Sequence, residues 1–398
     1  RCVPPAPTAL THTLFLSFGI SSTCPFFRTG FLDSDRLTPH AGLATPLVHV
    51  RRQPTRSPGS VANLMNNWAD ETQMPRRLYF PYGQSGFTKI REEGRFYVDR
   101  TEYIEALEAF KYQCFTRPPR WGKSCLVEML ACYYDNATTP EQWDAWFGGL
   151  GIHKKPTPLK GKFEVLQLDF SCATAGTVVE MKACLNTHIN LQCTKFAIKY
   201  GYTSCTELSA LRRVDFLLKD DDAMTTLTSL TKAVKARGKQ LYLFIDEYDR
   251  FANHFLLERE EFDTLEDRAA VVDTAEPIKE IFTTLKSLAA KGLSRLFITG
   301  LLRLAFSDNT CYNWVQLTSA EEALGPCLGF SLKTITCTVG MLELGAEGEE
   351  RARFEMEALS LITTSFNGYR FPGVDDEGLY CPQPVSYTHL RAHETLDH

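Results

Sequence analysis

A Gly-Lys-Ser triplet between a short apolar run and an amphipathic stretch is the feature that most constrains the fold of this chain. The loop over 117–124 ends in Lys123 and Ser124, and an apolar helical pattern follows over 126–134. A strand, a tight loop with Gly-Lys-Ser and a helix form the layout of a phosphate-binding loop, in which backbone N–H groups and the helix N-terminus hold a phosphate. Lys123 would then reach the terminal phosphates and Ser124 would hold Mg²⁺. The usual first glycine of this pattern is Arg117 here.

Four apolar runs alternate with helical patterns, and polar residues stand where the later runs end. Asp169 ends the second run, Asp246 and Glu247 follow the third, and Thr299 follows the fourth. This alternation predicts an α/β fold with right-handed crossovers and a parallel sheet with helices on both faces. The polar strand ends would meet at one edge, where ligands bind in open α/β sheets. We expect strands over 114–116, 165–170, 241–245 and 296–298, and helices over 101–110, 126–134, 177–199, 220–238 and 277–291.

Together these features predict a phosphate-loop nucleoside triphosphatase (P-loop NTPase) that binds ATP and Mg²⁺. Asp246 would hold Mg²⁺ through water, Glu247 would orient and polarise the attacking water, and Thr299 would sense the γ-phosphate or position that water. Arg303 could be an arginine finger or sensor, or it could form a structural ion pair. Asp169 could assist at the metal or only cap its strand. No Asn-Lys-x-Asp sequence is present, so guanine selectivity has no support and ATP is the expected nucleotide.

The other residues of the loop are further candidates for binding the cofactor. Arg117 and Arg120 could contact phosphates, or one of them could pair with an acid at the sheet edge. Trp121 is expected to pack where the loop turns down rather than to stack on the base. Gly122 and Cys125 complete the predicted cofactor-binding loop, and Cys125 is most simply a small buried hydrophobe.

The amino-acid composition limits the classes of protein to which this chain can belong. The apolar fraction of 44% is enough for a sizeable core, and the net charge of −5 argues against a generally basic nucleic-acid binder. The 13 cysteines are scattered without a C-x-x-C pair, which favours a reduced, intracellular compartment, cytoplasmic or nuclear, over a disulfide framework or a zinc site. No apolar run reaches the roughly 18 residues that a membrane helix needs, so no membrane association is expected.

The chain divides into four expected regions. Residues 1–77 are rich in proline, serine and threonine without a sustained period, and we expect a disordered or non-native leader there. The P-loop domain would span 78–345, and a helical pattern over 347–366 would begin a small C-terminal helical region over 346–383. The tail over 384–398 reads like translated sequencing-adapter sequence and is left out of the fold prediction.

The sequence resembles the AAA-ATPase-like family, whose members usually carry a C-terminal restriction-endonuclease-like nuclease domain. The matching blocks run in family order and cover 78–83 with Phe87, 96–101, 116–124, 168–171, 244–249, 297–300 with Arg303, 327–330 and 367–371. The resemblance implies an ATPase fold with its nucleotide site at the loop, and it makes Arg117 an expected family residue. The family loop typically reads Arg-Pro-Arg-Arg-Phe-Gly-Lys-Ser, so Pro119 and Trp121 are departures that remove one positive charge and enlarge one ring.

Three functions remain open from the sequence. The favoured one is a Mg²⁺-dependent ATPase of the class with an added strand between its two nucleotide motifs, coupled to an unknown partner or to the missing nuclease domain. The second is a nucleotide-binding regulatory scaffold with little or no turnover. The third is a small-molecule phosphotransferase, although nothing marks an acceptor site. Expected partners are ATP and a protein partner or a second copy of the chain, with nucleic acid only through a nuclease domain.

Overall fold

The structure is a computed structural model, and it describes residues 81, 86–172, 178–202, 222–250, 279–301, 313–340, 348–366, 369–374 and 378–382. All of these residues belong to one compact unit, Val50–His398. The leader expected over 1–77 and the tail over 384–398 lie outside the described residues. So does Arg303.

The core of the fold is a parallel sheet of five strands. They are β1 (Tyr112–Thr116), β2 (Glu164–Asp169), β3 (Leu241–Asp246), β4 (Leu293–Gly300) and β5 (Gln316–Leu317). The order across the sheet is β2-β3-β4-β1-β5, and every pair is parallel. The predicted α/β class, the parallel sheet and all four expected strands are confirmed. β5 was not expected, because two residues are too short to show a period.

The order of the strands in the sheet determines which loops lie next to one another at its edge. β4 lies between β1 and β3, with Phe115 opposite Thr299 and Ile245 opposite Ile298. The strand before the phosphate loop and the strand before Asp246 are therefore separated by one added strand, as the favoured sequence hypothesis expects. The end of β4 comes between the loop and the two acidic residues.

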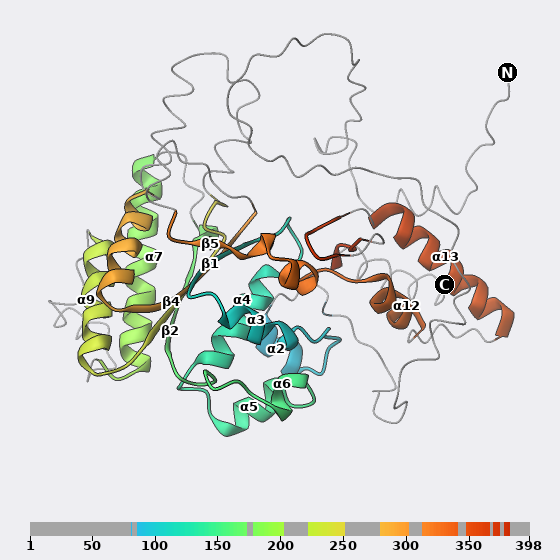
Figure 1. Ribbon diagram of the computed structural model, residues 1–398, viewed down its shortest axis with the longest axis horizontal. Helices are drawn as coiled ribbons and strands as arrows, with labels where there is room; N and C mark the ends of the chain where they lie inside the picture. Colours follow the sequence, from blue (N-terminus) through green and yellow to red (C-terminus); the bar gives the residue numbers. More distant parts are fainter. Residues whose placement is uncertain are drawn as a thin grey trace, which may run out of the picture. The chain divides into compact units, whose positions relative to one another are not determined.

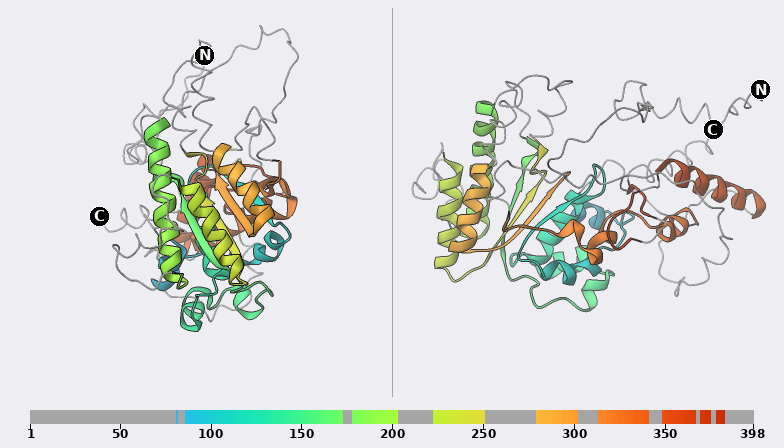
Figure 2. Two further views of the ribbon diagram at one scale, coloured as in Figure 1. Left: turned by 90° about the vertical axis from the view of Figure 1, so that its left-hand side faces the viewer. Right: turned by 45° about the horizontal axis from the view of Figure 1, so that its top comes forward.

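Three helices cover one face of the sheet (Figure 1). They are α7 (Val178–Lys199), α9 (Ala223–Ala236) and the helix over 279–291. α7 and α9 lie side by side across the strands in Figure 2, and Leu185, Leu230 and Leu285 from the three helices belong to one apolar core with the strands. Asp222 begins α9 by accepting a hydrogen bond from the Thr225 amide at 2.9 Å, as an acidic N-cap is expected to do.

The opposite face is covered by α4 (Lys123–Tyr134) and by four short helices, α2 (Phe87–Glu92), α3 (Ile104–Glu108), α5 (Pro140–Phe147) and α6 (Gly151–Lys154). Their core with the strands is rich in aromatic rings. Because helices lie on both faces, all six residues of β3 are buried. Burying a Leu, Ile or Phe side chain contributes roughly 1.5–3 kcal/mol each, which explains why β3 is a continuous apolar run.

Past β5 the chain continues through two short 3-10 helices, η7 (Thr318–Ala320) and η8 (Glu322–Cys327), and then α12 (Leu332–Gly340) and α13 (Gly348–Phe366). The helical pattern predicted over 347–366 is confirmed as α13. A third apolar cluster joins Ile335, Ile362 and Phe330 to Phe96 and Val98. The C-terminal helices therefore pack against the segment around Phe96 and Val98, near the start of the described residues.

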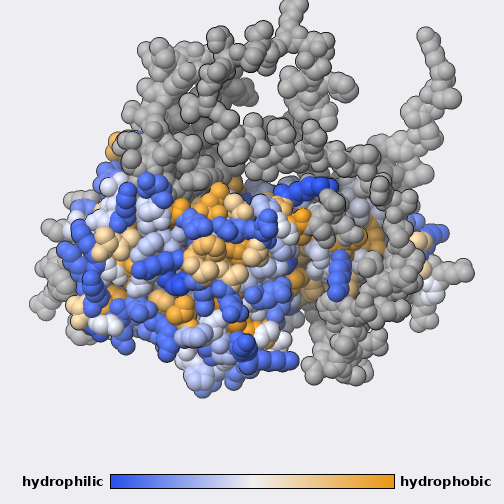
Figure 3. Space-filling view, viewed as in Figure 1, coloured by the Kyte–Doolittle hydropathy of each residue, from blue (hydrophilic) through white to orange (hydrophobic). Residues whose placement is uncertain are grey.

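The surface follows the same pattern of burial. In Figure 3 hydrophilic residues predominate at the left of the view, where Figure 1 places α7 and α9, although Val179, Leu191 and Ile198 of α7 are exposed as single apolar side chains. Within the described part of the chain, every helix is too short or too polar to cross a lipid bilayer.

Candidate functional site

The phosphate loop links the end of β1 to the first residue of α4. Arg120 and Gly122 both have left-handed backbone conformations, with φ of 68° and 85°. Helix α4 begins at Lys123, and its 12 residues align their dipoles towards that end. The N–H groups of the first turn have no acceptors within the helix, so they are available to an anion at the loop.

Lys123 is nearly buried, with 7% of its surface exposed. Its ammonium group donates to the carbonyl oxygen of Pro118 at 3.1 Å, within the loop itself. Burial lowers the pKa of Lys123, whereas the carboxylates of Asp246, Asp249 and Glu247 act to raise it. Burial outweighs the three carboxylates, so the pKa of Lys123 lies below its ordinary value.

Asp246 and Thr299 are joined at the ends of neighbouring strands. The Asp246 carboxylate accepts hydrogen bonds from the Thr299 hydroxyl and from the Glu247 amide, the latter at 3.0 Å. Both side chains are buried. The parallel pairing of β3 and β4 thus fixes the orientation of the acid from which a metal ligand is expected.

Glu247 projects from a strained position beyond β3. Its φ of 51° is left-handed, which is uncommon for a residue other than glycine. Its carboxylate forms an ion pair with Arg250 at 3.2 Å. Burial raises the pKa of Glu247, the Arg250 charge opposes this, and Asp246 and Asp169 add to the rise. A carboxyl group with a raised pKa is suited to accepting a proton.

Tyr248 and Asp249 attach the end of β4 to the residues at the end of β3, Asp246 to Asp249, which we call the acidic block. The Tyr248 amide donates to the Thr299 carbonyl at 3.1 Å, and Asp249 accepts from the Leu301 amide at 2.8 Å. A Cβ atom at Gly300 would lie only 2.6 Å from Asp249 Oδ1 and from two ring atoms of Tyr248. Glycine is required there by the close approach of the two segments. The Gly300 carbonyl also accepts from the Arg117 amide at 3.2 Å, so β4 connects the acidic block to the loop.

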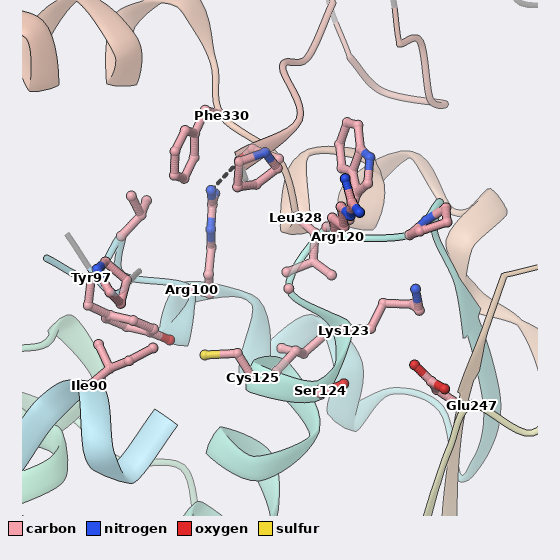
Figure 4. A pocket seen from close by; sticks show the side chains of 18 of the residues that line it. Ile90, Tyr97, Arg100, Arg120, Lys123, Ser124, Cys125, Glu247, Leu328 and Phe330 are labelled. Carbon is pink, nitrogen blue, oxygen red and sulfur yellow. Dashed lines mark hydrogen bonds between the residues drawn. The ribbon is translucent and has the colours of Figure 1, made fainter. Parts of the chain in front are cut away.

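A cavity of about 650 Å³ lies between these elements. This volume is in the range of ligand pockets. Figure 4 shows Lys123, Ser124 and Glu247 at one end and Ile90, Tyr97 and Phe330 at the other, so one end is polar and the other apolar. The lining residues are Pro81, Ile90, Phe96, Tyr97, Val98, Arg100, Pro119, Arg120, Trp121, Gly122, Lys123, Ser124, Cys125, Leu126, Glu247, Asp249, Arg250, Leu301, Leu328, Gly329, Phe330 and Pro382.

The structure brings most of the sequence-predicted residues to this cavity. Seven of them line it, namely Arg120, Trp121, Gly122, Lys123, Ser124, Cys125 and Glu247. Asp246 and Thr299 lie next to Glu247 but are not among the lining residues. Burial raises the pKa of the Cys125 thiol to about 12, so this group stays protonated at neutral pH.

Arg117 lies away from the lining of the cavity. Its guanidinium group donates to four backbone carbonyl groups, those of Thr116, Ser319, Leu324 and Gly325. Burial lowers the pKa of Arg117 to about 10. Neither sequence alternative, a phosphate contact or an acidic partner, describes this environment within the residues that the structure covers.

Several lining residues were not assigned any role from the sequence. At the apolar end lie Tyr97 and Phe330, and Arg100 donates to the Gly329 carbonyl, which connects the two walls. At the polar end are Asp249 and Arg250. Tyr97, Arg100, Asp249 and Phe330 lie within the blocks that carry the family resemblance, and Arg250 directly follows one of them. That resemblance was the one available signal, because an apolar residue beside a cavity has the same pattern as an apolar residue in a core.

Comparison with known proteins agrees with this geometry. A family model described as "AAA-ATPase_like: Predicted AAA-ATPase" matches residues 81–310, which is 230 of the 398 residues. The match contains the phosphate loop, all of β1 to β4 and the acidic block. A comparison with curated proteins found no match. On the extent of the family match, the chain belongs to the AAA-ATPase-like family.

Proposed function

We propose that this protein binds ATP with Mg²⁺ and hydrolyses it in the cavity between the phosphate loop and the end of β3. The observation that carries the proposal is the polar end of the cavity. Lys123 from the loop and Glu247 from the acidic block, far apart in the sequence, face one another there across open space (Figure 4). An ammonium group and a carboxylate around one space can hold a phosphate chain and a water molecule together.

The triphosphate would bind at the N-terminus of α4. Its charge would be met by the backbone N–H groups of the first turn and by the Lys123 ammonium group, which would exchange its hydrogen bond to Pro118 for one to phosphate. Arg120 lines the same region and adds a positive charge.

The residues present fit Mg²⁺. Ser124 offers a hydroxyl oxygen at the cavity, and Asp246 offers a carboxylate that is already oriented by two hydrogen bonds. Oxygen ligands of this kind are those that Mg²⁺ prefers. Bound there, the ion would neutralise charge on the β- and γ-phosphates. Ser124 would be a direct ligand and Asp246 would act through water.

The adenosine end of the nucleotide would lie along the apolar wall. Phe96 and Phe330 meet edge to face with ring centres 6.4 Å apart, and Ile90, Tyr97 and Leu328 continue the wall. An apolar wall with few polar groups is suited to a flat purine ring.

For hydrolysis, the acidic block would act on the attacking water. Glu247 would accept a hydrogen bond from the water and orient it towards the γ-phosphorus, while Thr299 holds Asp246 in place. The P–O bond to the β-phosphate then breaks, ADP leaves, and the proton of the water passes to the released phosphate through Glu247. Arg303 follows β4 in sequence and is proposed as a sensor of the γ-phosphate.

Two variants test this proposal. Lys123→Ala should abolish ATP binding measured by calorimetry, and Glu247→Gln should keep binding but stop phosphate release. Lys182→Ala is a matched control, because Lys182 forms an exposed ion pair with Glu280 on the other face of the sheet. Unchanged ATP affinity in Lys123→Ala would refute the proposal.

A nucleotide-binding scaffold with little turnover is the second candidate. The ion pair between Glu247 and Arg250 favours the scaffold, because Arg250 then occupies the carboxylate that would orient the attacking water. Steady phosphate release that disappears in Glu247→Gln would exclude the scaffold. Tight ATP binding without release in the wild-type protein would support it. Coupling to a partner protein or to a second copy of the chain remains our proposal for what the nucleotide controls.

A further inference from the structure

Arg117 is held between the phosphate loop and the C-terminal part of the chain. Its guanidinium carbon lies 4.5 Å from the ring centre of Phe115 and 4.0 Å from that of Phe371. Hydrogen bonds of 3.1 and 2.9 Å to the carbonyls of Leu324 and Gly325 complete the environment. A buried arginine held by carbonyls and rings joins three segments that are distant in the sequence.

Trp121 makes a second connection to the same segment. Its ring meets Tyr369 and Phe371 edge to face, with ring centres 4.9 and 5.2 Å apart. The side chain is 1% exposed, and its N–H group has no hydrogen-bond partner among the described residues. Packing alone therefore holds the ring. Gly329 has φ of +100°, and a Cβ atom at this position would collide with the Trp121 ring.

The contacting segment is itself fixed in place. The Leu379 amide donates to the Tyr369 carbonyl at 2.8 Å, and Phe330 and Tyr380 exchange two backbone hydrogen bonds of 2.9 Å. Past these bridges, the Cys381 thiol reaches the Arg120 carbonyl at 3.7 Å, and Pro382 lines the cavity. The segment thus contacts the loop and also forms part of the cavity wall.

We propose that the segment formed by residues 369–374 and 378–382 contributes to the nucleotide site, and that Tyr369 and Phe371 position the phosphate loop by packing against Trp121 and Arg117. This inference rests on the proposed function. It concerns residues beyond the family match, which ends at residue 310. Tyr369 and Phe371 are positioning residues, since they act on the nucleotide through the loop.

The physical reason is the strain of the loop. Arg120 holds a left-handed conformation that a residue other than glycine keeps only when its surroundings enforce it. The rings of Tyr369 and Phe371 pack against Arg117 and Trp121, on either side of the turn. If the segment stabilises the loop conformation that binds ATP, then bound ATP must stabilise the segment in return, because coupling between two sites is reciprocal.

Hydrogen exchange of the full chain tests the coupling in the wild-type protein. Addition of ATP and Mg²⁺ should slow exchange of the Leu379 and Tyr380 amides, although both lie in the bridges of the segment and not in the loop. Unchanged exchange at these two amides, in protein that binds ATP, would overturn the inference and leave the proposed function standing.

Substitution of Phe371 provides the second test. Phe371→Ala should raise the dissociation constant for ATP by about tenfold or more and speed exchange of the amides over 117–122 in nucleotide-free protein. At saturating ATP the turnover should change much less than the affinity. Phe371→Tyr keeps the ring and should bring the affinity back to within about threefold of wild type.

Leu230→Ala is the matched control, because Leu230 is buried in α9 and belongs to the apolar core on the other face of the sheet, away from the loop contacts. It should leave loop exchange and ATP affinity near wild type. Equal affinity of Phe371→Ala and wild type, with equal loop exchange, would overturn the inference. Absence of ATP binding by the wild-type protein would overturn the proposed function as well, and this outcome is visible without any variant.

Discussion

Replacing Gly300 by alanine is expected to destabilise the fold and weaken ATP binding together. A Cβ atom there would lie 2.6 Å from Asp249 Oδ1 and from two ring atoms of Tyr248. Carbon contacts are favourable at about 3.5–4.0 Å, so the two side chains would have to move by roughly 1 Å. Both are buried and cannot retreat into solvent. The strain must therefore displace the acidic block or the end of β4.

The magnitude follows from two contributions. Overpacking a filled interior costs about 1–3 kcal/mol. Displacing Asp249 weakens its hydrogen bond from the Leu301 amide, which contributes about 1 kcal/mol more. A loss of about 2–4 kcal/mol leaves a protein of ordinary stability folded. ATP binding should weaken because the displaced Asp249 lies close to Asp246, the proposed Mg²⁺ ligand, and because the Gly300 carbonyl accepts the hydrogen bond from the Arg117 amide in the loop.

Urea unfolding and calorimetry would measure the two effects. The midpoint should fall at an unchanged m-value, which identifies a change in stability and not in the unfolded state. Gly151→Ala is the control, because a Cβ at this position meets its nearest atom, Asp99 Oδ2, at an ordinary 3.5 Å, and its effect should stay within about 0.5 kcal/mol. A Gly300→Ala protein as stable as this control, with wild-type ATP affinity, would refute the reasoning.

Three further predictions concern the site and its support. Removing Arg250 removes the charge that lowers the pKa of Glu247, so in Arg250→Ala this pKa rises further and the acidic limb of phosphate release moves to higher pH. An unmoved limb, or one moved to lower pH, would contradict this. Thr299→Val removes the hydroxyl that donates to Asp246 and should lower the free energy of unfolding, measured in urea, by about 1–3 kcal/mol. A variant as stable as wild type would show that this hydrogen bond contributes nothing to stability. Asp222→Ala removes the N-cap of α9 and should lower the free energy of unfolding by about 0.5–2 kcal/mol. Asp222→Asn keeps an acceptor oxygen and should lower it less. Equal losses in the two variants would argue against a capping role.

The sequence was sufficient for the central layers of the fold. Apolar runs with polar ends gave the strands β1 to β4, since a strand covered on both faces must be apolar throughout, as β3 is. The helical periods placed α4, α7 and α9. Once the strands are parallel, their carboxyl ends must share an edge, so the proximity of Asp246 and Thr299 followed from the same pattern.

Other features depended on the tertiary structure. β5 has two residues and no period of its own, and it exists because it pairs with Gln113 and Cys114 of β1. The apolar end of the cavity is made by 90–100 and 328–330, which meet through the hydrogen bond from Arg100 to the Gly329 carbonyl. The apolar side chains among these residues cannot be told from core residues in the sequence, because only their position beside a cavity distinguishes them.

The phosphate loop has features that the sequence alone determined and others that only the tertiary structure decided. Its position between a strand and a helix, and its Lys123 and Ser124, were determined by the sequence alone. The role of Arg117 was decided by tertiary structure, because the carbonyls and the Phe371 ring that surround it come from about 200 to 250 residues further along the chain. A charged side chain in a sequence indicates only that it needs partners when buried. Which partners it finds depends on the segments that the fold brings beside it.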